Sequence, residues 1–233
     1  MIPSMEPSAF GHTDIHRPVY RTLTVSSQVR FEVRRSIFIG LASPTPEEDA
    51  ALALLADARK RYPDASHHVS AWVIGGETRL QRYSDDGEPQ GTAGLPVLDV
   101  LRRQHLEDAV VVVVRYFGGT LLGTGGLVHA YGRAAALAVQ ESLPVEMTLS
   151  DTFQITIAYA EYDRFRHQAE QAGFLLREAT FGMDVEVPVL VTAGQGPRLE
   201  ALLMDCTAGA GLIQPGPAEY IPTRILPEEP VDT

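Results

Sequence analysis

A glycine-rich loop between an apolar strand and a helix carries the residues best suited to bind an anion. The strand ends in Arg115 and Tyr116, and five glycines follow: Gly118, Gly119, Gly123, Gly125 and Gly126. A loop that opens a helix presents backbone N–H groups at the positive end of the helix dipole, and glycine allows a ligand to approach closely. The Arg115 guanidinium can fork onto a phosphate or a carboxylate. The alternative is that the glycines only pack the strand tightly against the helix.

The loop lacks the signatures of the common nucleotide-binding loops. A P-loop needs a lysine followed by Ser or Thr, but Lys60 is the only lysine in the chain. A dinucleotide-binding loop needs a third glycine where this chain has Val128. We therefore expect an anion to be held by the loop backbone and Arg115 rather than by a standard nucleotide motif.

Three carboxylates lie close together in a long polar segment rich in turn-forming residues: Asp85, Asp86 and Glu88. Oxygen ligands at this density can hold Mg²⁺, although their spacing does not match a calcium-binding loop. Asp side chains in turns also accept hydrogen bonds from nearby backbone N–H groups. A third interpretation is that a carboxylate faces a partner's arginine or a neighbouring helix end. The segment is a candidate part of the binding site, with Mg²⁺ as its one hypothetical cofactor.

No arrangement of residues indicates a catalytic nucleophile. His67 and His68 are adjacent in a predicted strand, so they point to opposite faces and do not easily share a metal ion. The only cysteine, Cys206, falls on the apolar face of a predicted helix, as is typical of a buried structural thiol. No Ser or Cys lies in a recognisable nucleophile elbow. We therefore expect no catalytic residues.

Strand and helix patterns in the first half predict a sheet with three helices. Residues 22–42 predict two or three antiparallel strands, and the helix that follows is expected to have Thr45 as its cap and Glu48 in a capping box. The unbroken valine run predicts a strand buried on both faces. The remaining strands and helices are expected at His67–Ile74, Thr78–Tyr83, Pro96–Arg103, Val110–Val114 and Gly125–Gln140.

The second half has the order β-α-β-β-α-β, which is typical of a ferredoxin-like unit. Its hairpin strands, Phe174–Phe181 and Val185–Val191, flank a turn at residues 182–184. Glycines just past the predicted helix ends, Gly173 and Gly209, support the helix boundaries. The fold class is therefore predicted as α+β, built from α/β two-layer sandwiches.

The charge balance argues against a broad nucleic-acid-binding surface. The formal net charge is −11: residues 1–150 contain 14 Lys and Arg against 17 Asp and Glu, and residues 151–233 contain 5 against 13. Nonspecific duplex binding is not expected, although a local positive groove is compatible with the first half. No signal peptide and no apolar run of membrane-spanning length is found, which predicts a cytoplasmic protein that does not bind a membrane.

Two long motifs resemble the IMPACT family. Residues 84–101 read SDDGEPQGTAGLPVLDVL and residues 111–135 read VVVVRYFGGTLLGTGGLVHAYGRAA. The chain is most similar in organisation to the two-domain bacterial members of the YigZ type. The resemblance implies a ribosomal-protein S5 domain 2-like N-terminal domain and a ferredoxin-like C-terminal domain. We place these domains at residues 19–143 and 144–222, between a flexible arm (1–18) and an acidic tail (223–233).

The resemblance also implies a link to translation, with RNA, the ribosome or a translation-associated protein as partner. The chain departs from the family at four positions that are usually basic: Ile37, Leu95, Leu121 and His129. Fewer cations predict weaker phosphate binding and a flatter salt dependence than in the family at large.

Two functional hypotheses follow. The first is a noncatalytic binding protein linked to translation or its regulation, with an anionic ligand held between Asp85–Glu88 and Arg115–Gly126. The alternative is a small-molecule enzyme that acts on a phosphorylated metabolite or nucleotide through the glycine-rich loop, with Asp86 as base or magnesium ligand. The missing loop lysine weighs against the alternative. The oligomeric state is left open.

Overall fold

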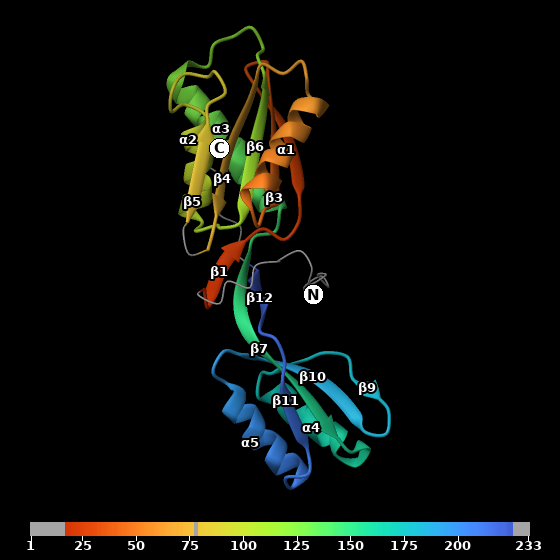
Figure 1. The fold of residues 1–233 in the computed structure, drawn as a ribbon. Helices are drawn as coiled ribbons and strands as arrows, with labels where there is room; N and C mark the ends of the chain where they lie inside the picture. Colours follow the sequence, from red (N-terminus) through yellow and green to blue (C-terminus); the bar gives the residue numbers. More distant parts are fainter. Residues whose placement is uncertain (1–16, 77–78, 226–233) are drawn as a thin grey trace. The chain divides into compact units, whose positions relative to one another are not determined.

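The computed structural model describes residues 17–76 and 79–225, which form two compact units (Figure 1). Each unit buries its own apolar residues, which form two cores in the N-terminal unit and one in the C-terminal unit. The division between the units falls a few residues after the predicted domain boundary at residue 143. The predicted arm and acidic tail lie mostly outside the described residues. The described parts of the units are Tyr20–Met147 with residues 222–225, and Arg17–Val19 with Thr148–Ile221.

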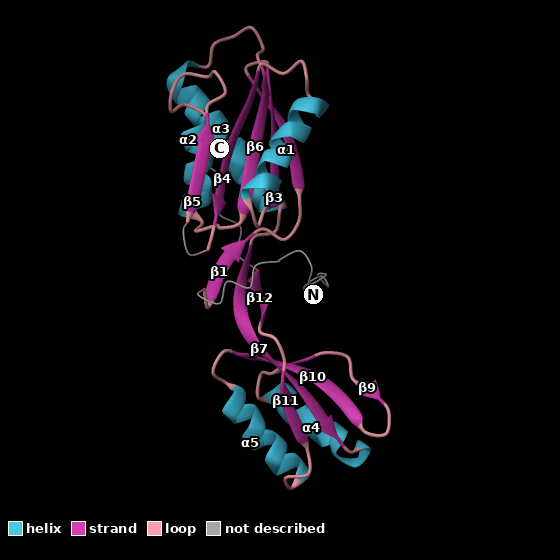
Figure 2. Ribbon diagram, in the orientation of Figure 1, coloured by secondary structure: helices cyan, strands magenta, loops and turns pink. Residues whose placement is uncertain are grey.

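A five-stranded antiparallel sheet forms the centre of the N-terminal unit (Figure 2). Its strands lie in the order β2, β3, β6, β4, β5, so the strand that comes last in the sequence occupies the middle. Their bounds in that order are Ser27–Val33, Ser36–Pro44, Ala109–Tyr116, His67–Ile74 and Leu80–Ser84. The strand predicted from Thr78 begins at Leu80, and Thr78 itself lies outside the described residues.

Three helices cover this sheet, and the predicted α+β class is confirmed. Helices α2 (Gly94–Arg103) and α3 (Gly123–Glu141) pack against one face and form the predicted two-layer sandwich. Helix α1 (Glu48–Arg61) covers part of the opposite face. Helices α2 and α3 each begin two residues earlier than the sequence predicts.

The valine run in β6 is buried on both faces of the sheet, as the sequence predicts. Val111 and Val113 belong to the core under α2 and α3, whereas Val110, Val112 and Val114 belong to the core under α1. Successive side chains of a strand point to opposite faces, so a central strand covered on both sides must be apolar throughout.

The predicted capping box at the start of α1 is wrong. The helix begins after Glu47, and no side chain caps it. Thr45 is instead tied to the sheet, because its N–H donates to the Asp108 carbonyl at 2.6 Å and its hydroxyl donates to the Ser43 carbonyl at 3.3 Å. Opposite charges at the two helix ends suit the helix dipole: Glu48 and Asp49 at the start, and Arg59, Lys60 and Arg61 at the end.

The C-terminal unit has the strand order of a ferredoxin-like fold. Strand β7 (Val145–Ile157) lies between β10 (Val185–Thr192) and β11 (Leu212–Pro215). Strands β8 (Leu175–Leu176) and β9 (Thr180–Phe181) pair with the other edge of β10. Helices α4 (Tyr159–Gln171) and α5 (Gly196–Thr207) complete one core with this sheet.

The strand predicted over Phe174–Phe181 is in fact two short strands. Arg177 N–H donates to the carbonyl of Pro188 at 2.9 Å, but Pro188 has no N–H to return a bond to this neighbour. The ladder therefore breaks at this point. The predicted turn at residues 182–184 is confirmed, with Val185 paired to Phe181.

Two further strands, β1 (Val19–Thr22) and β12 (Glu219–Ile225), pair with β7. Strand β7 begins at Val145, one residue after the predicted start of the second domain. Within residues 17–76 and 79–225, no helix has both the length and the apolar composition needed to span a membrane.

Candidate functional site

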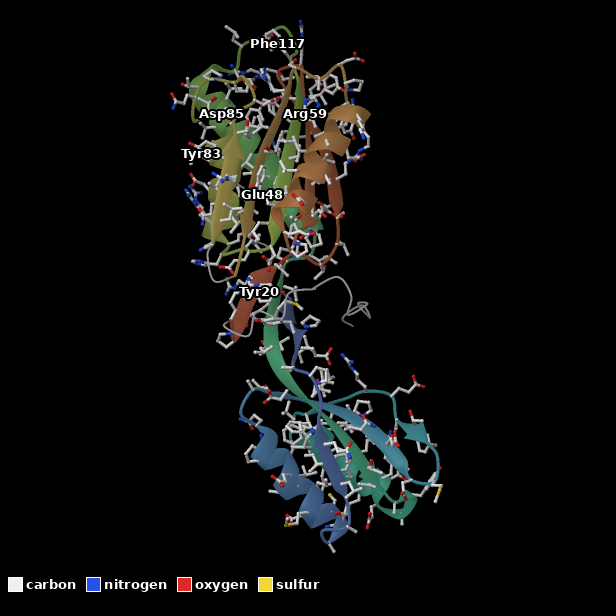
Figure 3. The ribbon with its side chains drawn as sticks, viewed as in Figure 1. Tyr20, Glu48, Arg59, Tyr83, Asp85 and Phe117 are labelled. Atoms are coloured by element: carbon white, nitrogen blue, oxygen red, sulfur yellow. The ribbon has the colours of Figure 1, made fainter. Side chains whose placement is uncertain are left out.

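Three segments that are distant in sequence meet at one end of the N-terminal sheet. They are the turn between β2 and β3, the acidic segment between β5 and α2, and the glycine loop between β6 and α3. Figure 3 shows Asp85, Arg59 and Phe117 toward this end. The Ser36 hydroxyl links two of the segments, because it accepts the Gly118 N–H at 3.2 Å and lies 3.3 Å from Arg115 Nη2.

Arg115 is buried in this end of the unit and is only 4% exposed. Its Nη1 donates to Glu88 Oε1 at 2.5 Å, and its guanidinium lies 5.6 Å from the ring centres of both Phe38 and Phe117. The expectation that this guanidinium forks onto a ligand therefore needs correction. Arg115 compensates a buried carboxylate of its own chain.

Glu88 is the centre of a buried polar cluster. Besides Arg115, its Oε1 accepts a hydrogen bond from the Tyr131 hydroxyl at 2.7 Å and lies 3.7 Å from His67 Nε2. Burial first, and then the adjacent Glu88, raise the pKa of Tyr131 above its ordinary value. Tyr131 was not predicted as a site residue, because its partner Glu88 lies 43 residues away in the sequence. In the sequence, the only indication of a role for Tyr131 was a hydroxyl group among the small apolar residues of the helix.

Asp85 serves the backbone of its own segment. Its Oδ2 accepts the Gly91 N–H at 2.9 Å, and its Oδ1 accepts the N–H groups of Ala93 at 3.1 Å and Gly94 at 2.7 Å. These bonds hold the acidic segment against the first turn of α2. Asp85 thus has the turn-stabilising role that the sequence left open.

Asp86 joins the acidic segment to α1 and β4. Its Oδ1 accepts from Arg59 Nη2 at 3.1 Å, and its Oδ2 accepts the His68 N–H at 2.6 Å. The Asp86 carbonyl lies 2.8 Å from His67 Nδ1, which therefore carries the proton. Along the described part of the chain, no group of three or more His, Cys, Asp or Glu residues is arranged to hold a metal. Magnesium binding stays a prediction, and it would have to displace these contacts.

The glycines of the loop have different roles. Gly118 packs so closely on the backbone of Arg35 that a Cβ would collide with its carbonyl group. Gly123 has a φ of +74°, a backbone region that favours glycine. The packing interpretation therefore holds at Gly118, whereas at Gly123 the backbone conformation accounts for the glycine. At both Gly123 and Gly125 an added Cβ would have no atom within 4 Å.

The N-terminus of α3 is exposed, and no side chain among the described residues caps it. Its N-cap residue is Leu122, and no acidic residue lies in the first turn. The first four N–H groups of a helix lack partners within that helix. These donors are the accessible part of the predicted site. Among the predicted glycines, Gly119, Gly123 and Gly125 are exposed, and Gly118 and Gly126 are half-buried.

Two arginines that were not predicted as site residues lie beside this loop. Arg34 and Arg35 form the turn between β2 and β3, with φ angles of 45° and 68°, and both are exposed. Such angles are uncommon for residues other than glycine and persist where the surrounding structure imposes them. The Arg35 carbonyl packs against Gly118, so the turn and the loop are neighbours. A two-residue gap between strand patterns was the available sequence signal.

The two aromatic residues that follow Arg115 differ in burial. Tyr116 is half-buried and packs against the core under α1, whereas Phe117 is 48% exposed. The Phe117 N–H donates to the Ser66 hydroxyl at 3.1 Å, which holds the start of the loop against the segment before β4. Phe117 therefore presents an anchored ring surface beside the glycine loop.

Comparisons with known proteins agree with the two motifs. Residues 34–139 match the model of the Impact N-terminal domain, and residues 155–210 match a domain of unknown function, DUF1949. The protein YigZ of Escherichia coli (strain K12) is 34% identical over 77% of this chain and 89% of its own length. The chain belongs to the IMPACT family. Its two matched regions fall in the two units and show the YigZ-type organisation of the family.

One solved structure supports the fold of this IMPACT family member. A crystal structure of a hypothetical protein is 30% identical, covers 84% of this chain and 96% of its own, and has a TM-score of 0.55. A solved structure described as the two-domain translational regulator Yih1 is 25% identical over 61% of this chain and 53% of its own, with a TM-score of 0.33.

Proposed function

We propose that this IMPACT family member is a noncatalytic binding protein linked to translation, whose N-terminal unit binds RNA phosphate. The phosphate contacts come from the N-terminus of α3 and from Arg34 and Arg35. The link to translation is supported by the family, because a similar two-domain protein is described as a translational regulator.

The observation that carries this proposal is an uncapped helix N-terminus beside two exposed arginines. Backbone N–H groups at the start of α3 are suited to phosphate oxygens, and a guanidinium can form paired hydrogen bonds with them. Neither Arg34 nor Arg35 forms an ion pair with an acidic residue among those described. Phe117 adds an exposed ring on which an unpaired base can stack.

Binding is favoured over catalysis because the groups of catalytic type are engaged within the protein. Glu88 is paired with Arg115 and Tyr131, and Asp85 accepts three backbone N–H groups. A general base must be able to reach the proton that it removes. The alternative, an enzyme acting on a phosphorylated metabolite with Asp86 as base, requires Asp86 to release Arg59 and the His68 N–H.

The net charge of −11 limits the expected affinity. Long-range attraction to RNA is absent, so binding depends on a few local contacts. Each phosphate that the protein contacts contributes roughly 0.7 to the slope of log affinity against log salt for a single strand. We therefore expect a shallow salt dependence and weak binding at moderate salt.

The test is fluorescence anisotropy with a labelled RNA hairpin that carries a single-stranded loop, at low and moderate salt, together with ribosome co-sedimentation. The full chain is compared with the double variant Arg34→Gln/Arg35→Gln. Glutamine removes the charge and keeps most of the side-chain length. We expect the double variant to reduce the salt slope by about 1 to 2 and to weaken binding at low salt.

The matched control is Arg103→Gln, because Arg103 is an exposed arginine on α2. It should bind like the unchanged chain. If the folded protein associates with neither RNA nor ribosomes at either salt, the proposal is wrong. Calorimetry with ATP and GTP in the presence of Mg²⁺ tests the enzymatic alternative, which predicts heat of binding that Asp86→Asn reduces.

A further inference from the structure

Within residues 17–76 and 79–225, the N-terminal sheet leaves one long edge unpaired. The strand order ends at β2, so no described strand pairs with its outer side. Strand β2 has seven residues, whereas β5, at the opposite edge, has five. A free edge exposes a row of backbone donors and acceptors that another strand can use.

The turn geometry determines which backbone groups face this edge. Arg34 and Arg35 form a two-residue turn, so Val33 and Ser36 are the hydrogen-bonded pair that flanks it. Hydrogen-bonded pairs alternate along an antiparallel ladder, so the backbones of Phe31 and Val29 also form hydrogen bonds with β3. The N–H and C=O groups of Gln28, Arg30 and Glu32 therefore point away from the sheet.

The charged and the apolar side chains of β2 lie on opposite faces of the sheet. On the face toward α1, Arg30 and Glu32 are exposed, and neither forms an ion pair with a described residue. On the face toward α3, Val29, Phe31 and Val33 are half-buried and pack against the core. One face thus offers two opposite charges, and the other offers a partly covered apolar row.

We infer that a second copy of this chain pairs antiparallel with β2 along this edge, centred on Phe31. Arg30 then lies opposite Glu32 of the second copy, and the symmetry of the pair makes this contact twice. On the other face Phe31 lies opposite its own counterpart, and Val29 lies opposite Val33. Opposite charges and aromatic or β-branched pairs are favourable cross-strand neighbours.

The charges select this register over its neighbours. The two nearest registers that use the same outward-facing backbone groups place Arg30 opposite Arg30 of the second copy, or Glu32 opposite its Glu32. Like charges directly opposite each other are unfavourable. Charged residues often protect an edge from pairing. Edge residues of a single charge sign repel a second copy in every register. Arg30 and Glu32 have opposite signs, so two copies of the strand can pair with each Arg30 opposite a Glu32.

Sedimentation velocity of the full chain over a concentration series tests the inference, which is independent of RNA binding. We expect a monomer–dimer equilibrium. Arg30→Glu alone and Glu32→Arg alone should each weaken dimerisation about tenfold or more, because each places like charges opposite one another twice. The double variant R30E/E32R restores the opposite-sign pairs and should restore the dimer.

A backbone variant gives a second, independent readout. The Arg30 N–H is not used within the sheet, so Arg30→Pro should fold and yet lose the dimer. Arg103→Glu, at an exposed position on α2, is the control for the charge change and should dimerise normally. A monomer at every concentration overturns the inference, as does a dimer that both single charge reversals leave unchanged.

Discussion

At the scale of single residues, burial decides what the charged groups can do. Arg115, Glu88 and Tyr131 form one buried cluster, in which the carboxylate accepts from both the guanidinium and the hydroxyl. Breaking a buried ion pair leaves a charge without compensation, which costs far more than the loss of an exposed pair. These residues therefore support the proposed binding surface from within, whereas the exposed Arg34 and Arg35 belong to that surface.

Arg115→Ala should lower the free energy of unfolding by about 3–5 kcal/mol, because it leaves Glu88 buried and unpaired. Urea unfolding measures this change. Arg103→Ala, at an exposed site, should stay within about 0.5 kcal/mol. A loss of RNA binding without a loss of stability would instead return Arg115 to the ligand-binding role that the sequence suggested.

Tyr131→Phe should change the alkaline stability of the N-terminal unit. The folded protein holds the Tyr131 proton above the ordinary pKa of 10.0, whereas the unfolded chain releases it near that value. The contribution is therefore fully present below pH 10.0 and is lost as the pH rises above it. Removal of the hydroxyl should cost about 1–3 kcal/mol at neutral pH and flatten the decline at high pH. Urea midpoints between about pH 8 and about pH 11 check both effects; an equally steep decline in the variant contradicts the assignment.

At the scale of elements, the glycine loop combines two requirements in one segment. Its first part must pack against the turn between β2 and β3, and its second part must start α3 with accessible backbone. Gly118 meets the first requirement, since a Cβ there would collide with the Arg35 carbonyl. Gly125 lies in the open first turn of α3. Positions only seven residues apart should therefore respond to the same substitution in opposite ways.

Gly118→Ala should destabilise the N-terminal unit by at least about 1–3 kcal/mol, because the backbone must move to admit the Cβ. Gly125→Ala should stabilise it by about 0.4–1 kcal/mol, because alanine loses less conformational entropy on folding. Thermal unfolding of the two variants side by side measures the difference. Equal effects of the two substitutions would show that the two positions are not distinguished by packing.

At the scale of the whole molecule, the apolar core of the C-terminal unit and the two cores of the N-terminal unit are built from separate sets of residues. The core of the C-terminal unit includes Phe165, which is fully buried, and contains no residue of the N-terminal cores. The single tryptophan, Trp72, is buried in the N-terminal unit. Its fluorescence therefore reports the unfolding of one unit, while circular dichroism reports both.

Phe165→Ala should destabilise the C-terminal unit by about 3–5 kcal/mol through the cavity that it leaves. The transition seen by circular dichroism should then move to lower urea concentration, while the transition of Trp72 fluorescence stays in place. RNA binding below the first transition should be unchanged, since the proposed contacts belong to the N-terminal unit. A parallel shift of the fluorescence transition would show that the two units unfold together.

The sequence by itself determined the element types, the fold class and the family. Apolar periodicity, turn residues and long motifs are local properties, so the buried valine strand and the ferredoxin-like order could be predicted without coordinates. The break between β8 and β9 was missed, because it depends on Pro188 in a neighbouring strand. Only the tertiary structure decided which charged residues are exposed. Glu88 and Arg115 are 27 residues apart, and only the folded sheet brings them together and removes them from water. The same folding places Arg34 and Arg35 beside the glycine loop, because burial and proximity arise from long-range packing rather than from local spacing.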